Sequence, residues 1–322
     1  MVKRWLPWLI KGGVSAGLIG WLLTKVDVAT AWQQAKTVDP WMAILALVLM
    51  LAQVLLGAVR WGMVLRALAG LLSAARTLKV YYIGVFFSLV LPGAAVGGDA
   101  MRMWFARRAG LDLATAVNSV MLERAVTVLG LVVLVAVTQP LLLARVPDIP
   151  GAWVFPVLLV VCIAGILVLS VLDRVPVSLR RWRLVSGLAT LAAATRKLFF
   201  HPGWGGGTLA VAVIGHVNLS LAAYVLALGL NLNVDVVDCL VLIPPVVLTT
   251  ILPISIGGWG VREGAMVTAF GFVGVEHQSA LVLSVLFAIV GMVTALPGGL
   301  VFLLSGEHRP APAELEGNKI EA

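Results

Sequence analysis

The stretch Leu91-Pro92-Gly-Ala-Ala-Val-Gly97-Gly98-Asp99-Ala-Met-Arg102 sets the organisation of this chain. A counterpart follows about half a chain later, Leu252-Pro253-Ile-Ser-Ile-Gly257-Gly258-Trp-Gly260-Val-Arg262-Glu263. Both copies contain Leu-Pro, then Gly-Gly, then an arginine four residues after the second glycine. The match favours an internal repeat over a coincidence in a glycine-rich chain.

The composition around these motifs excludes a soluble protein. Hydrophobic residues make up 61% of the 322 residues and charged residues 12%, against about 45–50% and about 25% in soluble domains. A soluble fold of this size could not bury so much apolar surface. The chain is therefore expected to be an all-α integral membrane protein with many spans.

Six segments are apolar and long enough to cross a bilayer, which takes about 20 helical residues. They are 6–24, 41–60, 113–137, 153–172, 207–230 and 279–304. The stretches 78–91 and 238–252 are too short to span; each ends at a repeated motif and is followed by another short stretch, 100–110 or 263–273. We expect about six full spans and two re-entrant hairpins of broken helices.

The chain has a net charge of +8, and its charged residues lie between the apolar runs. This placement is typical of residues that set membrane topology and not of a nucleic-acid-binding patch. Basic residues gather on the side that this arrangement makes cytoplasmic, with Arg60 at the cytoplasmic end of span 41–60. Both termini are then cytoplasmic. If the short stretches were full spans instead, Arg107 and Arg108 would move outside or into the bilayer.

This arrangement makes residues 1–305 one membrane domain of two halves, about 1–140 and 150–305, related by inverted topology. Inverted repeats with broken helices that meet near the midplane recur in transporters. Residues 173–206 are rich in arginine with interleaved apolar residues, which predicts an amphipathic cytoplasmic segment on the inner leaflet. The polar tail 306–322 is predicted to be disordered.

Ionisable residues at membrane depth cost about 2.5–3.5 kcal/mol each on insertion scales, so they need partners or a function. Three arginines and three acids are expected near the centre of the two halves: Asp99, Arg102, Glu123, Arg124, Arg262 and Glu263. Salt bridges that only hold the bundle together remain the alternative interpretation. We favour a substrate-binding role, because purely structural pairs can be replaced by apolar packing.

The paired glycines extend this candidate substrate-binding site. If they open short helices, free N–H groups and positive dipole ends face a cavity beside the arginines, an arrangement suited to a phosphate or carboxylate. Glycines that only permit tight helix packing are the alternative. The four glycines are Gly97, Gly98, Gly257 and Gly258.

Motifs for chemistry are absent from the sequence. It contains no phosphate-binding loop of an ATPase and no zinc-protease or serine-hydrolase motif, and its cysteines, Cys162 and Cys239, are far apart. We predict no catalytic residue, no metal site and no cofactor.

Three motifs in order resemble the flippase-like family, also called the lysylphosphatidylglycerol synthase transmembrane region: Gly97-Gly98-Asp99 with Arg102, Glu123-Arg124, and Gly257-Gly258-x-Gly260-x-Arg262-Glu263. The resemblance covers roughly residues 1–305 and implies a bundle with two re-entrant elements. In the bacterial multiple peptide resistance factors, such a region is fused to a synthase that makes aminoacylated phosphatidylglycerol, which the membrane part moves. The residues here include no synthase domain, so no transferase activity is implied.

The expected function is that of a lipid flippase in a bacterial inner membrane. Its expected partners are membrane lipids (an anionic or aminoacylated phospholipid, or a lipid-linked sugar), with a homo-oligomer or a partner synthase as further candidates. The alternative is a membrane-embedded transferase or accessory subunit, with Glu123 or Asp99 as general base. A purely structural membrane partner is a third hypothesis.

Overall fold

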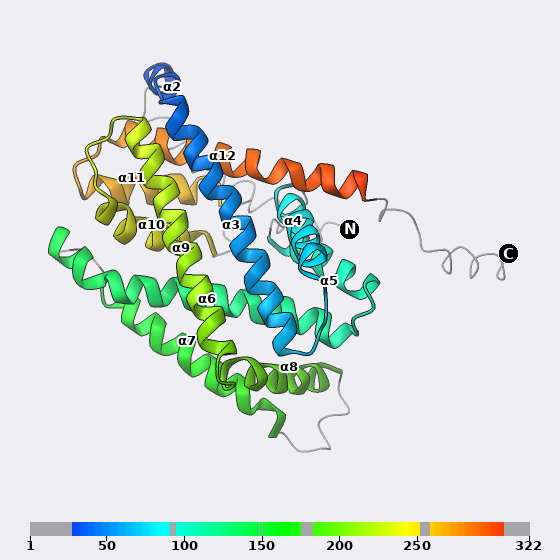
Figure 1. The fold of residues 1–322 in the computed structure, drawn as a ribbon. Helices are drawn as coiled ribbons and strands as arrows, with labels where there is room; N and C mark the ends of the chain where they lie inside the picture. The colour runs from blue at the N-terminus through cyan, green and yellow to red at the C-terminus, as the bar shows by residue number, and fades with distance from the viewer. Residues whose placement is uncertain are drawn as a thin grey trace, which may run out of the picture.

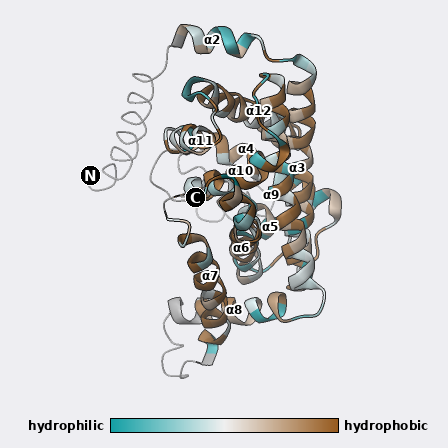
Figure 2. Cartoon of the chain, turned by 90° about the vertical axis from the view of Figure 1, so that its left-hand side faces the viewer, coloured by the Kyte–Doolittle hydropathy of each residue, from teal (hydrophilic) through white to brown (hydrophobic). Residues whose placement is uncertain are grey.

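The computed structural model describes residues 28–90, 95–147, 149, 151–174, 183–251 and 258–305. Within these ranges every regular element is a helix (Figure 1). Figure 2 shows that apolar residues dominate the helices of the bundle. The expected disordered tail 306–322 lies outside the described residues.

Five helices in this part of the chain are long and apolar enough to cross a membrane, which confirms an all-α integral membrane protein. They are α3 (Pro40–Ala67), α6 (Leu113–Arg145), α7 (Val154–Val171), α9 (Trp204–Gly229) and α12 (His277–Leu304). They correspond to five of the six expected spans. The sixth, 6–24, lies outside the described residues, so the total of six stays a prediction.

Four shorter helices form the two hairpins that the broken apolar stretches predict. Helix α4 (Ala74–Val90) packs on α5 (Ala95–Arg108), and α10 (Val236–Ile251) packs on α11 (Val261–Gly271). The first pair lies between the end of α3 and the start of α6, and the second lies between the end of α9 and the start of α12. The inverted relation of the two halves stays a prediction.

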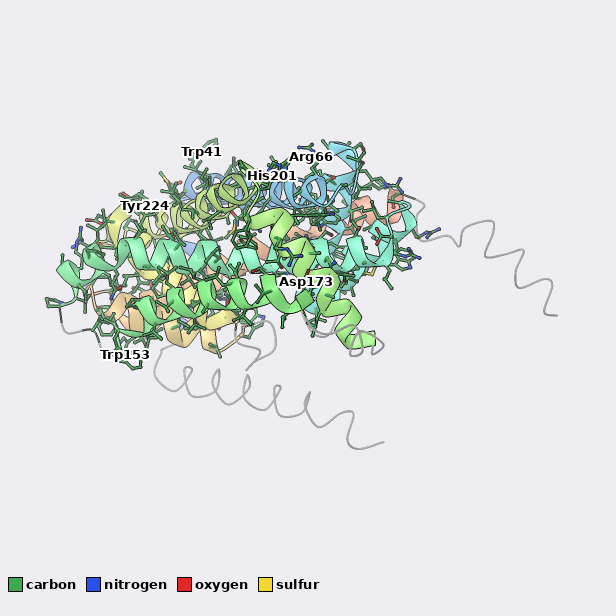
Figure 3. The ribbon with its side chains drawn as sticks, turned by 90° about the horizontal axis from the view of Figure 1, so that it is seen from below. Trp41, Arg66, Trp153, Asp173, His201 and Tyr224 are labelled. Atoms are coloured by element: carbon green, nitrogen blue, oxygen red, sulfur yellow. The ribbon has the colours of Figure 1, made fainter. Side chains whose placement is uncertain are left out.

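Two helices lie at opposite ends of the bundle, α2 (Val28–Lys36) and α8 (Arg183–Phe199) (Figures 1 and 2). The short helix η1 (Leu172–Arg174) connects to α7, and Arg196 of α8 donates to Asp173 of η1 at 2.5 Å and to the Ser170 carbonyl of α7 at 2.5 Å. Seen from below, Trp41, Tyr224 and Arg66 lie along one side of the molecule, and Trp153 lies on the opposite side (Figure 3).

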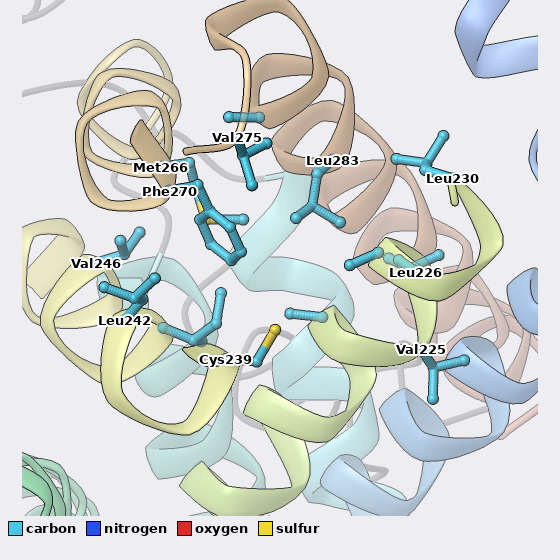
Figure 4. Packing of buried hydrophobic residues seen from close by; sticks show 14 of the residues in the cluster. Val225, Leu226, Leu230, Cys239, Leu242, Val246, Met266, Phe270, Val275 and Leu283 are labelled. Atoms are coloured by element: carbon cyan, nitrogen blue, oxygen red, sulfur yellow. The ribbon is translucent and has the colours of Figure 1, made fainter. Parts of the chain in front are cut away.

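Each hairpin has its own apolar core. In the larger cluster, Leu242 of α10, Phe270 of α11 and Leu283 of α12 lie together with residues of α9 (Figure 4). In the second cluster, Trp61 of α3 and Phe105 of α5 are fully buried with residues of α4 and α6. The two hairpins are thus held by separate sets of side chains.

Helix α12 packs closely against α4, because two consecutive residues at the contact are glycines. A Cβ atom on Gly298 would lie 2.3 Å from the Tyr82 carbonyl oxygen, and one on Gly299 would lie 2.7 Å from the Phe86 ring. Small residues allow such contacts between membrane helices, where van der Waals packing is a main source of association. The glycines therefore fix the position of the first hairpin against the last span.

We expect Gly298→Ala to destabilise the protein by about 1–3 kcal/mol, because the added methyl group meets backbone that cannot move aside. Gly291→Ala in the same helix is the matched control, since no atom outside its own helix lies within 4 Å of the added Cβ. Thermal unfolding of both variants in detergent measures the difference. Equal melting temperatures for the two variants would contradict the proposed packing.

Candidate functional site

Five ionisable side chains from three helices meet inside the bundle, and we call them the central charge cluster: Arg60 of α3, Asp99 and Arg102 of α5, and Glu123 and Arg124 of α6. Glu123 is its buried centre. Arg60 donates to Glu123 Oε1 from Nη2 at 2.5 Å and from Nε at 2.9 Å, and Arg102 Nη1 donates to Oε2 at 3.0 Å. One carboxylate thus joins two arginines on different helices.

The second carboxylate, Asp99, binds the remaining arginine of the cluster. Arg124 donates from Nε to Asp99 Oδ2 at 2.8 Å and from Nη2 to Oδ1 at 2.9 Å. This two-pronged geometry is the one in which guanidinium recognises carboxylate or phosphate. The adjacent residues Glu123 and Arg124 do not pair with each other, because Glu123 pairs with Arg60 and Arg102 while Arg124 pairs with Asp99.

Arg102 is the most enclosed cation of the cluster and has donors to spare. Its residue surface is 3% exposed, and its guanidinium lies 4.6 Å from the Trp61 ring centroid and 4.7 Å from that of Tyr81. Among the described residues, its Nε and Nη2 atoms have no hydrogen-bond partner. Buried polar groups are nearly always satisfied, so these donors mark a place where an acceptor is expected.

The cluster contains three arginines and two carboxylates, so it has one excess positive charge. Helices α3 and α6, which supply three of the five residues, are apolar enough to span a membrane. An uncompensated cation in such surroundings favours the binding of an anion. The Arg124 side chain is 42% exposed, which leaves it accessible to a ligand.

A second, smaller charged group belongs to the other hairpin. Arg262 donates to Glu263 Oε1 from Nη2 at 2.5 Å and from Nε at 3.1 Å, and its guanidinium lies 5.0 Å from the Trp259 ring centroid. Arg262 also lines a mostly apolar cavity of about 180 Å³ between α9, α10, α11 and α12. One guanidinium at an apolar cavity is suited to the headgroup and chain of an amphipathic ligand.

The structure divides the six predicted ionisable residues between these two groups. Asp99, Arg102, Glu123 and Arg124 come together, whereas Arg262 and Glu263 pair separately. Among the described residues, no ion pair or side-chain hydrogen bond joins the two groups. The single centre expected from the sequence is therefore two sites, one for each hairpin.

The predicted glycines have different local roles. Gly97 and Gly98 lie inside the first turn of α5, and a Cβ on Gly98 would be 2.2 Å from the Gly84 carbonyl oxygen of α4, so Gly98 serves close packing. Gly258 has a φ of +80°, a conformation that glycine adopts readily. Gly257 lies outside the described residues.

The N-terminus of α11 is occupied by its own chain. Gly260, with φ of +85°, is the N-cap, and its N–H donates to Glu263 Oε2 at 2.6 Å. The carboxylate of Glu263 thus takes the position in which an anion at this helix end is expected. An incoming anion at this helix end would have to displace that carboxylate.

Arg60 corrects the sequence interpretation, which placed it at the cytoplasmic end of a span. Helix α3 continues to Ala67, and Arg60 is a buried member of the central charge cluster. A span length of about 20 residues stopped the predicted helix too early. The apolar run Trp61–Leu65 beyond Arg60 is the signal that the helix continues.

Helix α6 is also tied to the second hairpin, at its other end. Arg145 donates to Asp238 at 2.6 Å and to Asp235 at 2.7 Å, beside the start of α10. The hydrogen bonds from Arg145 and from the Asp238 backbone N–H hold the pKa of Asp235 below its ordinary value. No group of three His, Cys, Asp or Glu side chains in the described ranges could hold a metal ion.

We expect Glu123→Gln to destabilise the protein by about 3–5 kcal/mol, because it leaves two buried arginines facing a neutral group. The double variant Arg60→Met with Glu123→Gln removes one of those cations and should recover part of the loss. Thermal unfolding in detergent measures both variants. A Glu123→Gln variant as stable as wild type would show that the carboxylate does not hold the cluster together.

Asp235→Asn is expected to flatten the dependence of stability on pH in acid. A carboxyl whose folded pKa is lowered stabilises the protein above its unfolded pKa, about 3.9, and loses that contribution as the pH falls through the folded value. Unfolding temperatures of wild type and variant, compared from pH 6 to pH 3, should converge. A constant difference over that range would contradict the Arg145–Asp235 contribution.

Comparison with known proteins places the chain in a family of lipid-related membrane proteins. The family model for the lysylphosphatidylglycerol synthase TM region matches residues 8–299. No curated protein and no solved structure matches the chain. The match covers both hairpins and both charged groups. The chain belongs to the lysylphosphatidylglycerol synthase transmembrane-region family.

Proposed function

We propose that this protein moves a lipid with a phosphate-bearing headgroup from one leaflet of a bacterial inner membrane to the other. The observation that carries the proposal is the central charge cluster. It has one excess positive charge and buried Arg102 donors with no partner among the described residues. A phosphate oxygen supplies both the missing negative charge and the missing acceptor.

The exposed member of the cluster suggests how a headgroup enters. Arg124 binds Asp99 through two parallel hydrogen bonds and is 42% exposed at its side chain. Two phosphate oxygens can replace the two carboxylate oxygens of Asp99 with the same geometry. Asp99 then releases Arg124 to the lipid and keeps its contact with Arg102, which lies 3.4 Å away.

A second arginine provides a further binding position for the headgroup as the lipid moves to the other leaflet. Arg262 lies at the cavity of the second hairpin, paired with Glu263. Helix α6 contacts both hairpins, through Arg124 at one and Arg145 at the other. In the proposed cycle, the headgroup passes from one hairpin to the other as α6 moves relative to them. When the lipid has left, Asp99 pairs again with Arg124, and Glu263 pairs again with Arg262.

The basic residues suggest how the proposed transporter is oriented in the membrane. The end of the bundle at which α8 lies is assigned to the cytoplasm, because α8 carries Arg196 and Lys197 in its last turn and basic residues near the ends of spans favour that side. The N- and C-termini are assigned to the same side. We further propose that the protein catalyses no covalent chemistry. An enzyme that synthesises the lipid, or a second copy of the chain, is the expected partner.

The test is transbilayer movement in liposomes that contain the purified protein and a fluorescent phosphatidylglycerol, with external dithionite reporting the outer leaflet. We expect Arg124→Gln to slow the movement about 10–100-fold, the worth of charge-assisted hydrogen bonds of about 1.5–3 kcal/mol. Arg196→Gln is the matched control. It too removes an arginine with a 42% exposed side chain that pairs with an aspartate, but at the edge of the bundle.

Two results would contradict the proposal. One is wild-type protein that moves neither anionic, zwitterionic nor aminoacylated phospholipids. The other is a folded Arg124→Gln variant that moves the lipid as fast as the control. Mass spectrometry of the recovered lipid separates transport from the transferase alternative, which predicts a chemically changed product.

A further inference from the structure

A pocket of about 230 Å³ lies outside both charged groups, between the end of α3, the start of α6 and the inner face of α8. Its walls combine small apolar residues with four polar ones. Leu68 follows the last residue of α3, and Ala114, Thr115 and Asn118 come from α6. The remaining lining residues lie on one face of α8, at helical spacing: Thr190, Ala193, Ala194 and Lys197.

Asn118 is the observation that marks this pocket as a binding site. The residue is 8% exposed and lines the pocket. Within the described part of the chain, its side-chain amide takes part in no hydrogen bond, whereas the neighbouring Ser119 hydroxyl accepts one from Trp61 at 3.2 Å. The amide atoms are open to the pocket and uncommitted to the protein, so they are available to hydrogen-bond a ligand there.

Lys197 supplies the charge that identifies the class of ligand. It is exposed and makes no ion pair with the described residues. The nearby carboxylate of Asp112 is engaged as the N-cap of α6, where it accepts from the Thr115 N–H at 2.9 Å. The Thr190 hydroxyl donates to the Gly187 carbonyl at 2.8 Å. The uncommitted groups are thus an amide and an ammonium, which together suit a phosphate.

We infer that this pocket holds the phosphate group of an anionic phospholipid from the leaflet on which α8 lies. Helix α8 crosses the end of the bundle (Figure 1). Leu188 of α8 and Phe200, the residue after its last turn, have exposed apolar side chains. Exposed apolar residues beside a lysine are typical of a helix in the membrane interface. The headgroup is then at the depth of the pocket, with its acyl chains beside the bundle.

The inference is tested by lipid binding, in an Arg124→Gln background that weakens the central charge cluster. The full chain in nonionic detergent is titrated with dioctanoyl phosphatidylglycerol, dioctanoyl phosphatidylcholine or inorganic phosphate, and native mass spectrometry counts bound molecules. We expect preference for phosphatidylglycerol. Lys197→Gln and Asn118→Leu should each weaken its binding about tenfold, the worth of one charge-assisted hydrogen bond.

Controls separate loss of the site from loss of the fold. Lys36→Gln removes an exposed lysine from α2 at the opposite end of the bundle and should leave binding unchanged. Lys197 is exposed and Asn118 loses no hydrogen bond to the described residues, so both variants should melt like their parent. Unchanged phosphatidylglycerol binding in both variants would overturn the inference. Inorganic phosphate that binds as tightly as the lipid would overturn the assignment to a lipid.

Discussion

The carboxylate of Glu123 is the constraint on which the arrangement of the first half depends. It is buried between Arg60 and Arg102, so α3, α5 and α6 cannot separate without leaving charges unpaired in an apolar bundle. Removing the partner of a buried charge destabilises a protein by much more than the intact pair stabilises it. The cluster therefore fixes the first hairpin laterally, while the glycines of α12 fix it from the other side.

Much of the fold was predictable because its signals are local. Apolar length predicts the long helices, and the Pro and Gly-Gly breaks predict the hairpins, since both depend on neighbouring residues alone. Span boundaries are less local, and Arg60 shows why. A charge looks like the end of a span unless its partner is known, and that partner, Glu123, is 63 residues away.

Four of the five members of the central charge cluster were predictable from the sequence, but Arg60 and the pairing within the cluster were not. Ionisable residues within apolar segments stand out in a sequence, so Asp99, Arg102, Glu123 and Arg124 are found without a structure. Their partners depend on the rotation and crossing of helices. The packing role of Gly98 was not predictable for the same reason, because the sequence does not show that Gly98 lies against Gly84 across the hairpin. Asn118 has no sequence signal, because a single asparagine in a helix is ordinary.

Helix α6 has a consequence for how the two halves communicate. It binds the first hairpin through Arg124 and the second through Arg145, and its 33 residues extend about 50 Å if straight. A ligand that stabilises one position of α6 relative to one hairpin changes the free energy of the contact between α6 and the other hairpin. By thermodynamic linkage the effect is reciprocal. A ligand that binds at one hairpin by shifting α6 would therefore change the free energy of binding at the other hairpin by the same amount.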